Sequence, residues 1–418
     1  MIILSSDDHT IEPPNVFDGR LASRYQNRAP KLMQDAEGHD HWVFEGKDVA
    51  TVGLNATASW PPQEWGMNPS SFAEMRPGAY LVDERVRDMD RNGVLASMCF
   101  PSMPGFSGGR LYDATDKELA LAVLQAYNDW HVDEWCGSHP GRFIPLIIGP
   151  GWDPEAMVTE IHRMAAKGAR AISLPELPHL LGLPSYRSDY WFPVWTALSE
   201  ENVVACLHIG QGLDALDMGP EFPIDNYMVL ATQVSVLCTQ DLIWGPAMRT
   251  FPDLKFAFSE GGIGWLPFLL DRLDRHYAHQ RWTGQDFGGE QPSEVFREHS
   301  LACFISDPTT LKLYREIGLD MIAYEVDFPH SDSTWPDAPE ELLRECQGAG
   351  MSDEDIDQLT WKNVARFFNY DPFAHITREQ ATVGALRANA TDVETAIVPR
   401  AEWRRRYEAN PRFEVASV

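Results

Sequence analysis

The sequence predicts an α/β protein of the (β/α)8 TIM-barrel class, with a long insertion after the first strand and a C-terminal extension. Eight short apolar runs alternate with helical patterns, and four of these runs lead into a histidine or a carboxylate. Apolar strands that alternate with helices are typical of a parallel sheet covered on both faces. Closure of eight such strands into a barrel is the economical arrangement, and a doubly wound open sheet is the alternative.

The first strand is expected at residues 2–4, shortly before Asp7, His9 and Glu12. Because side chains alternate along a strand, Asp7 and His9 share a face and can reach one point above the strand end. Glu12 lies one short turn further along the chain. Such residues also occur in solvated turns, so the interpretation depends on similar residues at other strand ends.

Three later strands end in the same way. The run at 203–207 leads into His208, the run at 254–259 into Glu260, and the run at 321–326 into Asp327. In a barrel the C-terminal ends of the strands surround one mouth, where the catalytic residues of this fold lie. The barrel therefore predicts that these side chains converge with those of the first strand.

The insertion covers residues from about 17 to 80. Alternating apolar residues at 41–52, with Gly46-Lys47 in the middle, predict a β-hairpin. The following segment, 58–78, is rich in Trp, Pro, Asn and Ser, and long loops of this kind are usually functional lids or partner-contacting arms. We expect its aromatic residues to roof the barrel mouth or to contact a second subunit: Trp60, Trp65, Phe72 and Tyr80.

From residue 82 onward the alternation is regular. A helix at 83–92 would end at Gly93, because glycine readily adopts the left-handed conformation of a helix C-cap. The other predicted strands are 94–100, 142–148, 169–174 and 301–306. The other predicted helices are 117–136, 154–167, 191–200, 227–244, 266–277, 309–317, 339–347 and 353–368.

The last residues, 373–418, have no strand-like rhythm but carry the aromatic residues Trp403, Tyr407 and Phe413. Because these side chains have apolar surface to cover, we expect an extension that wraps the barrel or a second subunit. The chain accordingly divides into a barrel at 1–372 and an extension at 373–418, and a homodimer is expected.

The composition restricts the possible partners. A formal charge of -28 argues against nucleic acid and anionic membranes, because an acidic surface repels both. No apolar run reaches the length of a membrane span, and the N-terminus lacks a secretory signal, so a cytoplasmic location is expected. The six cysteines show no disulfide spacing, and those inside apolar runs are expected to be buried and reduced.

Four motifs follow one another along residues 1–372. They are Asp7-x-His9-x-x-Glu12-Pro-Pro, Leu207-His208-Ile209-Gly210, Ser259-Glu-Gly-Gly-Ile-Gly-Trp-Leu-Pro267 and Val326-Asp-Phe-Pro-His330-Ser-Asp332. Together they resemble the amidohydrolase superfamily, and more narrowly its branch with aminocarboxymuconate semialdehyde decarboxylase and the resorcylate-type decarboxylases. The resemblance implies a metal-dependent TIM barrel in which Asp7, His9, His208 and Asp327 bind a divalent cation.

The sequence departs from these decarboxylases at the sixth strand, where Glu260 stands in place of their histidine. A histidine can protonate or orient a substrate near neutral pH, whereas an ionised glutamate is an acceptor and can bind a second metal ion. With Glu12 and Glu260 the chain has ligand types for one or two ions, of Fe, Zn or Mn. The alternatives are that Glu12 caps backbone N–H groups and that Glu260 orients His208.

We expect a metal-dependent hydrolase that acts on a carboxylic-acid derivative, namely an amide, ester or thioester. The metal would lower the pKa of a bound water molecule, and Asp327 would accept its proton, with His330 and Glu260 as further candidate catalytic residues. The alternative is a metal-dependent non-oxidative decarboxylase of a carboxylated aromatic or enoic acid, in which Asp327 transfers a proton. A barrel without activity is disfavoured, because every expected ligand type is present.

Overall fold

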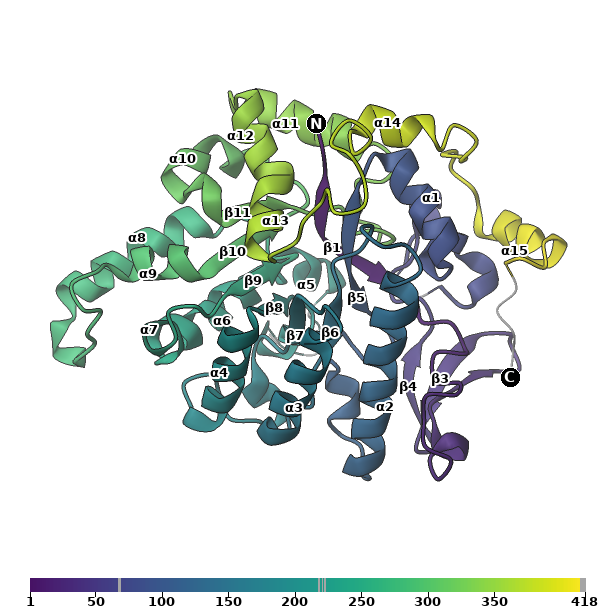
Figure 1. The fold of residues 1–418 in the computed structure, drawn as a ribbon, viewed down its shortest axis with the longest axis horizontal. Coiled ribbons are helices and arrows are strands. Elements are labelled where there is room, and N and C mark those ends of the chain that lie inside the picture. Colours follow the sequence, from purple (N-terminus) through teal and green to yellow (C-terminus); the bar gives the residue numbers. More distant parts are fainter. Residues whose placement is uncertain (67–68, 217–218, 220, 222, 414–418) are drawn as a thin grey trace. The chain divides into compact units, whose positions relative to one another are not determined.

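Helices and parallel strands alternate along the chain, as the apolar runs predict (Figure 1). The computed structural model describes residues 1–66, 69–216, 219, 221 and 223–413. The chain divides into two units. Unit 1 comprises Met1–Ile148, Val326–Glu341 and Asp371–Val418, and unit 2 comprises Gly149–Glu325 and Leu342–Tyr370.

Three strands of unit 1 correspond to the first three predicted strands. Strand β1 (Leu4–Thr10) pairs in parallel with β5 (Ala96–Pro101), and β6 (Leu146–Ile148) follows a parallel bridge between Ser97 and Phe143. Every residue of β1 is buried, although six of its seven side chains are polar. A strand with so many buried polar groups needs internal partners for them, and these partners build the candidate site described below.

The helices of unit 1 begin and end where local chemistry favours it. Helix α1 (Val82–Asn92) ends at Gly93, whose φ of +78° supplies the expected left-handed C-cap. Helix α2 (Lys117–Trp130) begins after Asp116, whose side chain accepts a hydrogen bond from the backbone N–H of Leu119. A π-helix (His131–Cys136) continues α2, so the predicted helix at 117–136 is confirmed with a change of hydrogen bonding near its end.

The insertion contains the predicted hairpin. Strands β3 (Asp40–Phe44) and β4 (Lys47–Thr51) are antiparallel, and the turn residues Glu45 and Gly46 both have positive φ, as a tight hairpin requires. A third strand, β2 (Lys31–Gln34), was not predicted and pairs with β3. Three of the four aromatic residues named above, Trp60, Phe72 and Tyr80, are buried, while Trp65 is 45% exposed. Most of this aromatic set therefore packs inside unit 1.

Unit 2 carries five strands in chain order, each parallel to its neighbour. They are β7 (Ala171–Leu174), β8 (Val204–His208), β9 (Phe256–Ser259), β10 (Ser300–Phe304) and β11 (Ile322–Tyr324). The helices that follow or connect them are α3 (Pro154–Ala165), α4 (Phe192–Glu201), α5 (Ile224–Leu230), α6 (Gln233–Trp244), α7 (Ala247–Thr250), α8 (Leu266–His279), α9 (Pro292–His299) and α10 (Tyr314–Ile317). The chain continues with α11 (Ala338–Gly348), α12 (Asp353–Asp357) and α13 (Asn363–Phe367). Counted over the described residues of both units, eight strands match the eight predicted runs.

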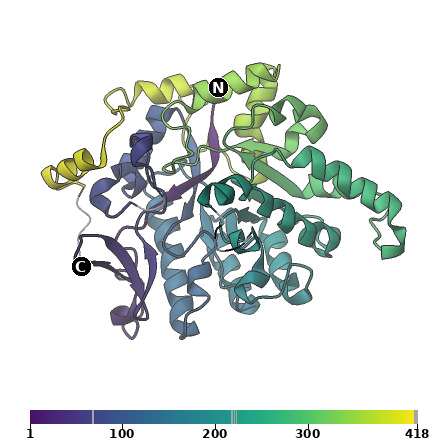
Figure 2. The ribbon, with the colours of Figure 1, turned by 180° about the vertical axis from the view of Figure 1, so that it is seen from behind.

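The helices of unit 2 differ from the prediction in two places. The predicted helix at 227–244 is two helices, α5 and α6, which are separated at Ala231 and Thr232. Helix α9 was not predicted, although Pro292 at its first position and the capping box between Gln291 and Glu294 are ordinary helix-start signals. Figure 2 shows α9 returning beside α8 as a helical hairpin (green).

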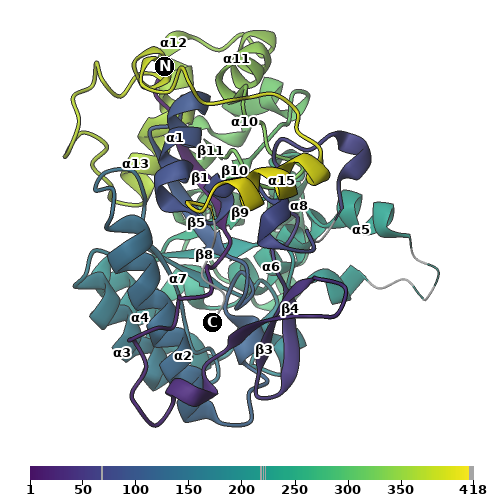
Figure 3. The ribbon, with the colours of Figure 1, turned by 90° about the vertical axis from the view of Figure 1, so that its right-hand side faces the viewer.

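The C-terminal extension folds onto the insertion within unit 1. Its helices are α14 (Val383–Ala388) and α15 (Arg400–Ala409), and α15 is the yellow helix of Figure 3. Arg400 and Arg404 bind the carboxylate of Glu74 at 2.8 and 2.7 Å. Burial opposes ionisation of Glu74, but hydrogen bonds from Arg400, Ser70 and Arg404 outweigh it and lower its pKa to about 2. The predicted homodimer stays a prediction.

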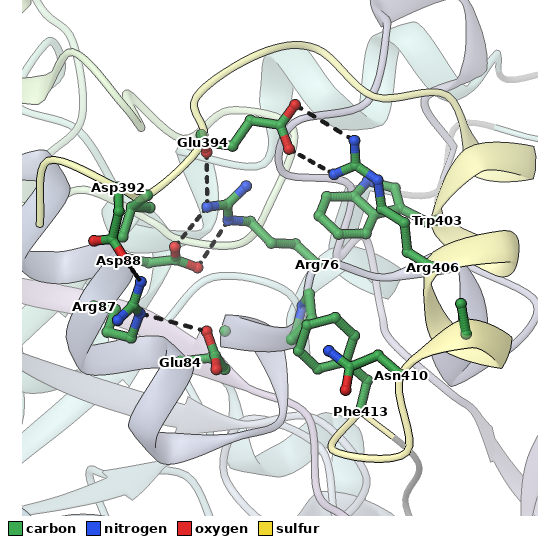
Figure 4. A pocket seen from close by; sticks show the side chains of 14 residues that line it. Arg76, Glu84, Arg87, Asp88, Asp392, Glu394, Trp403, Arg406, Asn410 and Phe413 are labelled. Atoms are coloured by element: carbon green, nitrogen blue, oxygen red, sulfur yellow. Dashed lines mark hydrogen bonds and ion pairs between the residues drawn. The ribbon is translucent and has the colours of Figure 1, made fainter.

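A cavity of about 370 Å³ lies beside α15 (Figure 4). Its three arginines each face carboxylates: Arg76 binds Asp88 at 2.7 Å, Arg87 binds Asp392 at 2.8 Å, and Arg406 binds Glu394 at 2.6 Å. These pairs compensate the charges of the cavity wall, and one of them, between Arg87 and Asp392, joins α1 to the extension.

All six cysteines are buried and free, which confirms that no disulfide contributes to the fold. Among the described residues, no helix combines the length and apolar character that a membrane crossing requires.

We expect Glu74→Gln to reduce the free energy of unfolding by about 1 to 3 kcal/mol at pH 7, because the two arginines lose a buried charged partner. In the folded protein the pKa of Glu74 lies below 4.5, the ordinary value of a glutamate side chain. The difference between the proteins should therefore be complete above pH 4.5 and disappear as the pH falls through about 2. Urea unfolding at several pH values measures this. Glu402→Gln, which removes a half-buried carboxylate paired with Arg405 and Arg406 of its own helix, is the control, and an equal loss in both variants would refute the assignment.

Candidate functional site

Four buried side chains of unit 1 meet around His9, and we call them the unit 1 cluster: Asp7, His9, Asp327 and His330. The Nε2 atom of His9 lies 3.2 Å from Oδ1 of Asp327 and 3.6 Å from Oδ1 of Asp7. The Nδ1 atom of His330 lies 2.9 Å from the same Oδ1 of Asp327. The two imidazole rings are stacked, with centroids 3.8 Å apart.

The backbone of β1 positions this cluster. The N–H of Asp327 donates to the carbonyl of Asp7 at 3.0 Å, and the N–H of His9 donates to the carbonyl of Phe328 at 2.7 Å. Asp327 has a φ of +58°, a left-handed conformation that costs energy in a residue other than glycine. The surrounding hydrogen bonds must therefore hold the turn, and they aim the Asp327 side chain at His9.

Two buried side chains of opposite charge, Asp8 and Arg85, lie near the cluster and act on each other through their charges. Asp8 points to the other face of β1 and accepts hydrogen bonds from the Ser97 hydroxyl and from the N–H of Phe328, the latter at 2.9 Å. Arg85 is fully buried and donates to the carbonyl of His9, and to that of Gly78 at 2.7 Å. Burial raises the pKa of Asp8 to about 6, against the opposing effect of the Arg85 charge.

We expect Arg85→Met to destabilise the protein by about 3 to 5 kcal/mol, because Asp8 would remain as a buried charge without its cation and two carbonyls would lose their donor. Arg87→Met removes an arginine from the exposed face of the same helix and should cost less than about 1 kcal/mol. Chemical unfolding of the metal-free proteins checks this. Similar losses for both variants would contradict the proposed role of Arg85.

Glu12 is held by the loop that follows β5. Its two carboxylate oxygens accept hydrogen bonds from the N–H groups of Ser102 and Met103, at 2.9 and 2.8 Å. Burial raises the pKa of Glu12 to about 7, although these hydrogen bonds and the charge of Arg110 lower it. The contacts match the alternative in which Glu12 caps backbone groups, and its role as a metal ligand stays a prediction.

In unit 2, His208 ends β8 and Glu260 follows β9. Nε2 of His208 lies 3.5 Å from Oε2 of Glu260, and Nδ1 of His208 lies 2.5 Å from the carbonyl oxygen of Ile209. A carbonyl accepts, so Nδ1 carries the proton and Nε2 is available as a ligand. Glu260 has a φ of +54°, and its N–H donates to Glu325 at 3.1 Å.

Sequence reasoning missed two buried carboxylates of unit 2. Glu325 lies inside the apolar run at 321–326 that predicts a strand, so the sequence gives no sign of its role. It is completely buried and accepts a hydrogen bond from the N–H of Glu260. Glu176 follows β7, and it accepts hydrogen bonds from the N–H groups of Gln211 and Gly212 at 3.2 and 3.1 Å. Burial raises its pKa to about 8. The strand-end rule that identified Glu260 would have found Glu176.

The donor set of the unit 1 cluster suits a divalent cation. His9, Asp327 and His330 each present a ligand atom, and these atoms lie within 4.8 Å of one another. Imidazole nitrogens with carboxylate oxygens are typical ligands for Mn, Fe and Zn. The buried carboxylates Asp7 and Asp327 would be costly without a positive charge nearby.

Comparisons with known proteins give a family model and several solved structures of similar fold. A protein-family model described as amidohydrolase matches residues 37–370. No curated protein matches the sequence. Among solved structures, an amidohydrolase from Mycobacterium avium subsp. paratuberculosis K-10 has 20% identity and a TM-score of 0.68, over 88% of this chain and 99% of that chain.

Two similar structures are decarboxylases solved with manganese. The 5-carboxyvanillate decarboxylase from Novosphingobium aromaticivorans, with 4-hydroxy-3-methoxy-5-nitrobenzoic acid bound, has 19% identity and a TM-score of 0.59, over 88% of this chain and 96% of that chain. The dihydroxybenzoic acid decarboxylase from Polaromonas sp. JS666, with 2-nitroresorcinol bound, has 20% identity and a TM-score of 0.56, over 74% of this chain and 90% of that chain. At these identities the likeness concerns the fold.

Proposed function

This chain belongs to the amidohydrolase family, whose TIM-barrel fold confirms the predicted fold class, and we propose that it is a metal-dependent decarboxylase of a small aromatic or enoic acid. The observation that carries the proposal is the buried Asp327–His330 pair beside His9. It is a proton-transfer group next to a potential cation site. The manganese-bound decarboxylases of similar fold support the same reading.

We propose Asp7, His9, His208 and Asp327 as ligands of one divalent ion, Mn, Zn or Fe. Support comes from the family, from the ligand atoms of the unit 1 cluster, and from the Nδ1 proton of His208, which leaves Nε2 as a donor. A second ion held with Glu12 and Glu260 remains the dinuclear alternative. The bound ion would supply positive charge that holds the substrate carboxylate and stabilises negative charge developing during the reaction.

The reaction breaks the bond between the ring or enoic carbon and the carboxyl carbon. The electron pair stays on the former carbon, which takes a proton, and carbon dioxide leaves. Asp327 is the proposed proton donor, and His330, whose Nδ1 lies 2.9 Å from Asp327 Oδ1, would return the proton to it. Because both side chains are at most 5% exposed, bulk water is largely kept from this transfer.

Hydrolysis is the second candidate function, because Glu260 stands where the similar decarboxylases are expected to carry a histidine. A carboxylate 3.5 Å from His208 accepts a proton from water more readily than it donates one to carbon. In that case the substrate is an amide, ester or thioester, and Asp327 acts as the general base, with Glu260 as a further candidate for that role.

We expect purified protein loaded with Mn²⁺ to hold about one ion per chain, and Asp327→Asn to lower activity by at least about 100-fold, as expected for loss of an acid–base group. Metal content by inductively coupled plasma mass spectrometry and turnover assays measure the two quantities. Asp332→Asn, an exposed change on the same loop, is the control. Two ions per chain would favour the dinuclear alternative, and an unaltered activity of Asp327→Asn would exclude the proposed role.

The reaction class is tested with paired substrates. The Mn²⁺ enzyme is incubated in ¹⁸O-labelled water with 2,6-dihydroxybenzoate, with 5-carboxyvanillate, and with the methyl ester and amide of each. A decarboxylase releases carbon dioxide and leaves a product without ¹⁸O. Incorporation of ¹⁸O into a carboxylate released from an ester or amide, without carbon dioxide, would establish hydrolysis in its place.

A further inference from the structure

The loop that follows β5 places an aromatic side chain against the two imidazoles of the unit 1 cluster. The ring centroid of Phe106 lies 5.0 Å from that of His9 and 6.5 Å from that of His330. His9 and His330 are buried, whereas Phe106 keeps part of its surface exposed. Phe106 therefore contacts the buried polar cluster and is itself partly accessible to solvent.

The loop is fixed at its base. Glu12 binds the N–H groups of Ser102 and Met103 with its two oxygens, and the Ser102 hydroxyl donates to the carbonyl of Thr10 at 2.9 Å. Arg110 closes the far end by donating to the carbonyls of Ser102 and Met103, at 2.5 and 3.1 Å. These contacts tie the loop to the residues that directly follow His9 in the sequence.

The interior of the loop is equally constrained. Two turns follow each other, with the N–H of Gly105 on the carbonyl of Ser102 at 3.1 Å and the N–H of Gly108 on the carbonyl of Gly105 at 2.8 Å. Gly108 has a φ of +80°, and a Cβ atom there would lie 3.3 Å from Ile148. Phe106 is the second residue of the second turn, so hydrogen bonds constrain the backbone that carries its ring.

We propose that Phe106 is a specificity-determining residue that packs on the planar ring of the substrate, and that Glu12 is the positioning residue that anchors its loop. The proposal rests on the proposed function, since it assumes that the unit 1 cluster receives the substrate carboxylate. A flat apolar wall beside two stacked imidazoles fits a planar carboxylic acid. Offset or edge-to-face aromatic contact adds affinity that a saturated ring of similar size does not gain.

The experiment measures binding, so it does not depend on turnover. Dissociation constants for benzoate, 4-hydroxy-3-methoxy-5-nitrobenzoate and cyclohexanecarboxylate are determined by calorimetry on the Mn²⁺-loaded full chain. Phe106→Leu should weaken binding of the two aromatic acids by about tenfold and leave the saturated acid within about twofold. Phe106→Tyr, which keeps the ring, should restore the preference. Phe268→Leu, the same change at an exposed position on α8, should alter nothing.

Glu12 is tested with Glu12→Gln, which keeps one acceptor oxygen but turns an amide toward one of the two N–H groups. We expect the aromatic preference to fall several-fold while the manganese content and the Mn²⁺ electron paramagnetic resonance spectrum stay unchanged. A loss of manganese would make Glu12 a ligand and overturn its positioning role. An unchanged aromatic preference in a folded Phe106→Leu protein would overturn the role of Phe106.

The failure of the proposed function has a different signature. A Phe106-dependent preference for aromatic acids without release of carbon dioxide would refute decarboxylation and leave the present assignment standing. A manganese-loaded wild-type protein that binds none of the three acids would overturn both.

Discussion

The arrangement of unit 1 depends on the backbone hydrogen bonds between β1 and the turn at Asp327. Two of them, from Asp327 to Asp7 and from His9 to Phe328, join segments more than three hundred residues apart in the sequence. They fix the Asp327 side chain beside His9 in spite of a left-handed backbone. Asp8 and Arg85 stabilise the same contact. Asp8 accepts a hydrogen bond from the N–H of Phe328, and Arg85 donates one to the carbonyl of His9. The arrangement at Asp327 therefore requires polar residues of β1 to be buried. The stability of unit 1 depends on hydrogen bonds that satisfy these residues.

The same device occurs independently in unit 2. Glu260, like Asp327, has a positive φ directly after a run of buried residues, and a buried carboxylate, Glu325, accepts its N–H. Strained backbone persists only where its surroundings hold it, and it concentrates at functional positions. Asp307 adds a second brace by accepting the N–H of Ile263 at 2.6 Å. That both candidate carboxylates are held in this costly conformation is a physical reason, separate from any motif, to regard them as functional.

Sequence reasoning identifies those residues whose positions follow from strand periodicity or from the ends of strands. Asp7 and His9 were grouped because strand alternation puts them on one face, and Asp327 was added because apolar runs in a parallel fold end together. Asp8 was passed over because the same alternation turns it away, and only the fold reveals Arg85 opposite it. Phe106 could not be found in this way, since it lies in a glycine- and proline-rich loop whose path is set by contacts with Glu12 and Arg110. Glu325 was hidden because an apolar run does not signal a completely buried carboxylate.

The chemistry finally depends on which group holds a proton. A histidine after β9 would offer an acid near neutral pH, whereas Glu260, whose Oε2 atom lies 3.5 Å from Nε2 of His208, places a carboxylate oxygen at this position. The proposed proton donor to carbon therefore belongs to the unit 1 cluster, where Asp327 and His330 share a short contact in a buried setting. A single acid–base pair suffices for decarboxylation, which needs one proton delivered to one carbon. Hydrolysis needs a proton removed from water and another delivered to the leaving group. The unit 1 cluster offers one acid–base pair, which matches the single proton transfer of decarboxylation. We prefer decarboxylation for this reason, even though Glu260 alone would favour hydrolysis.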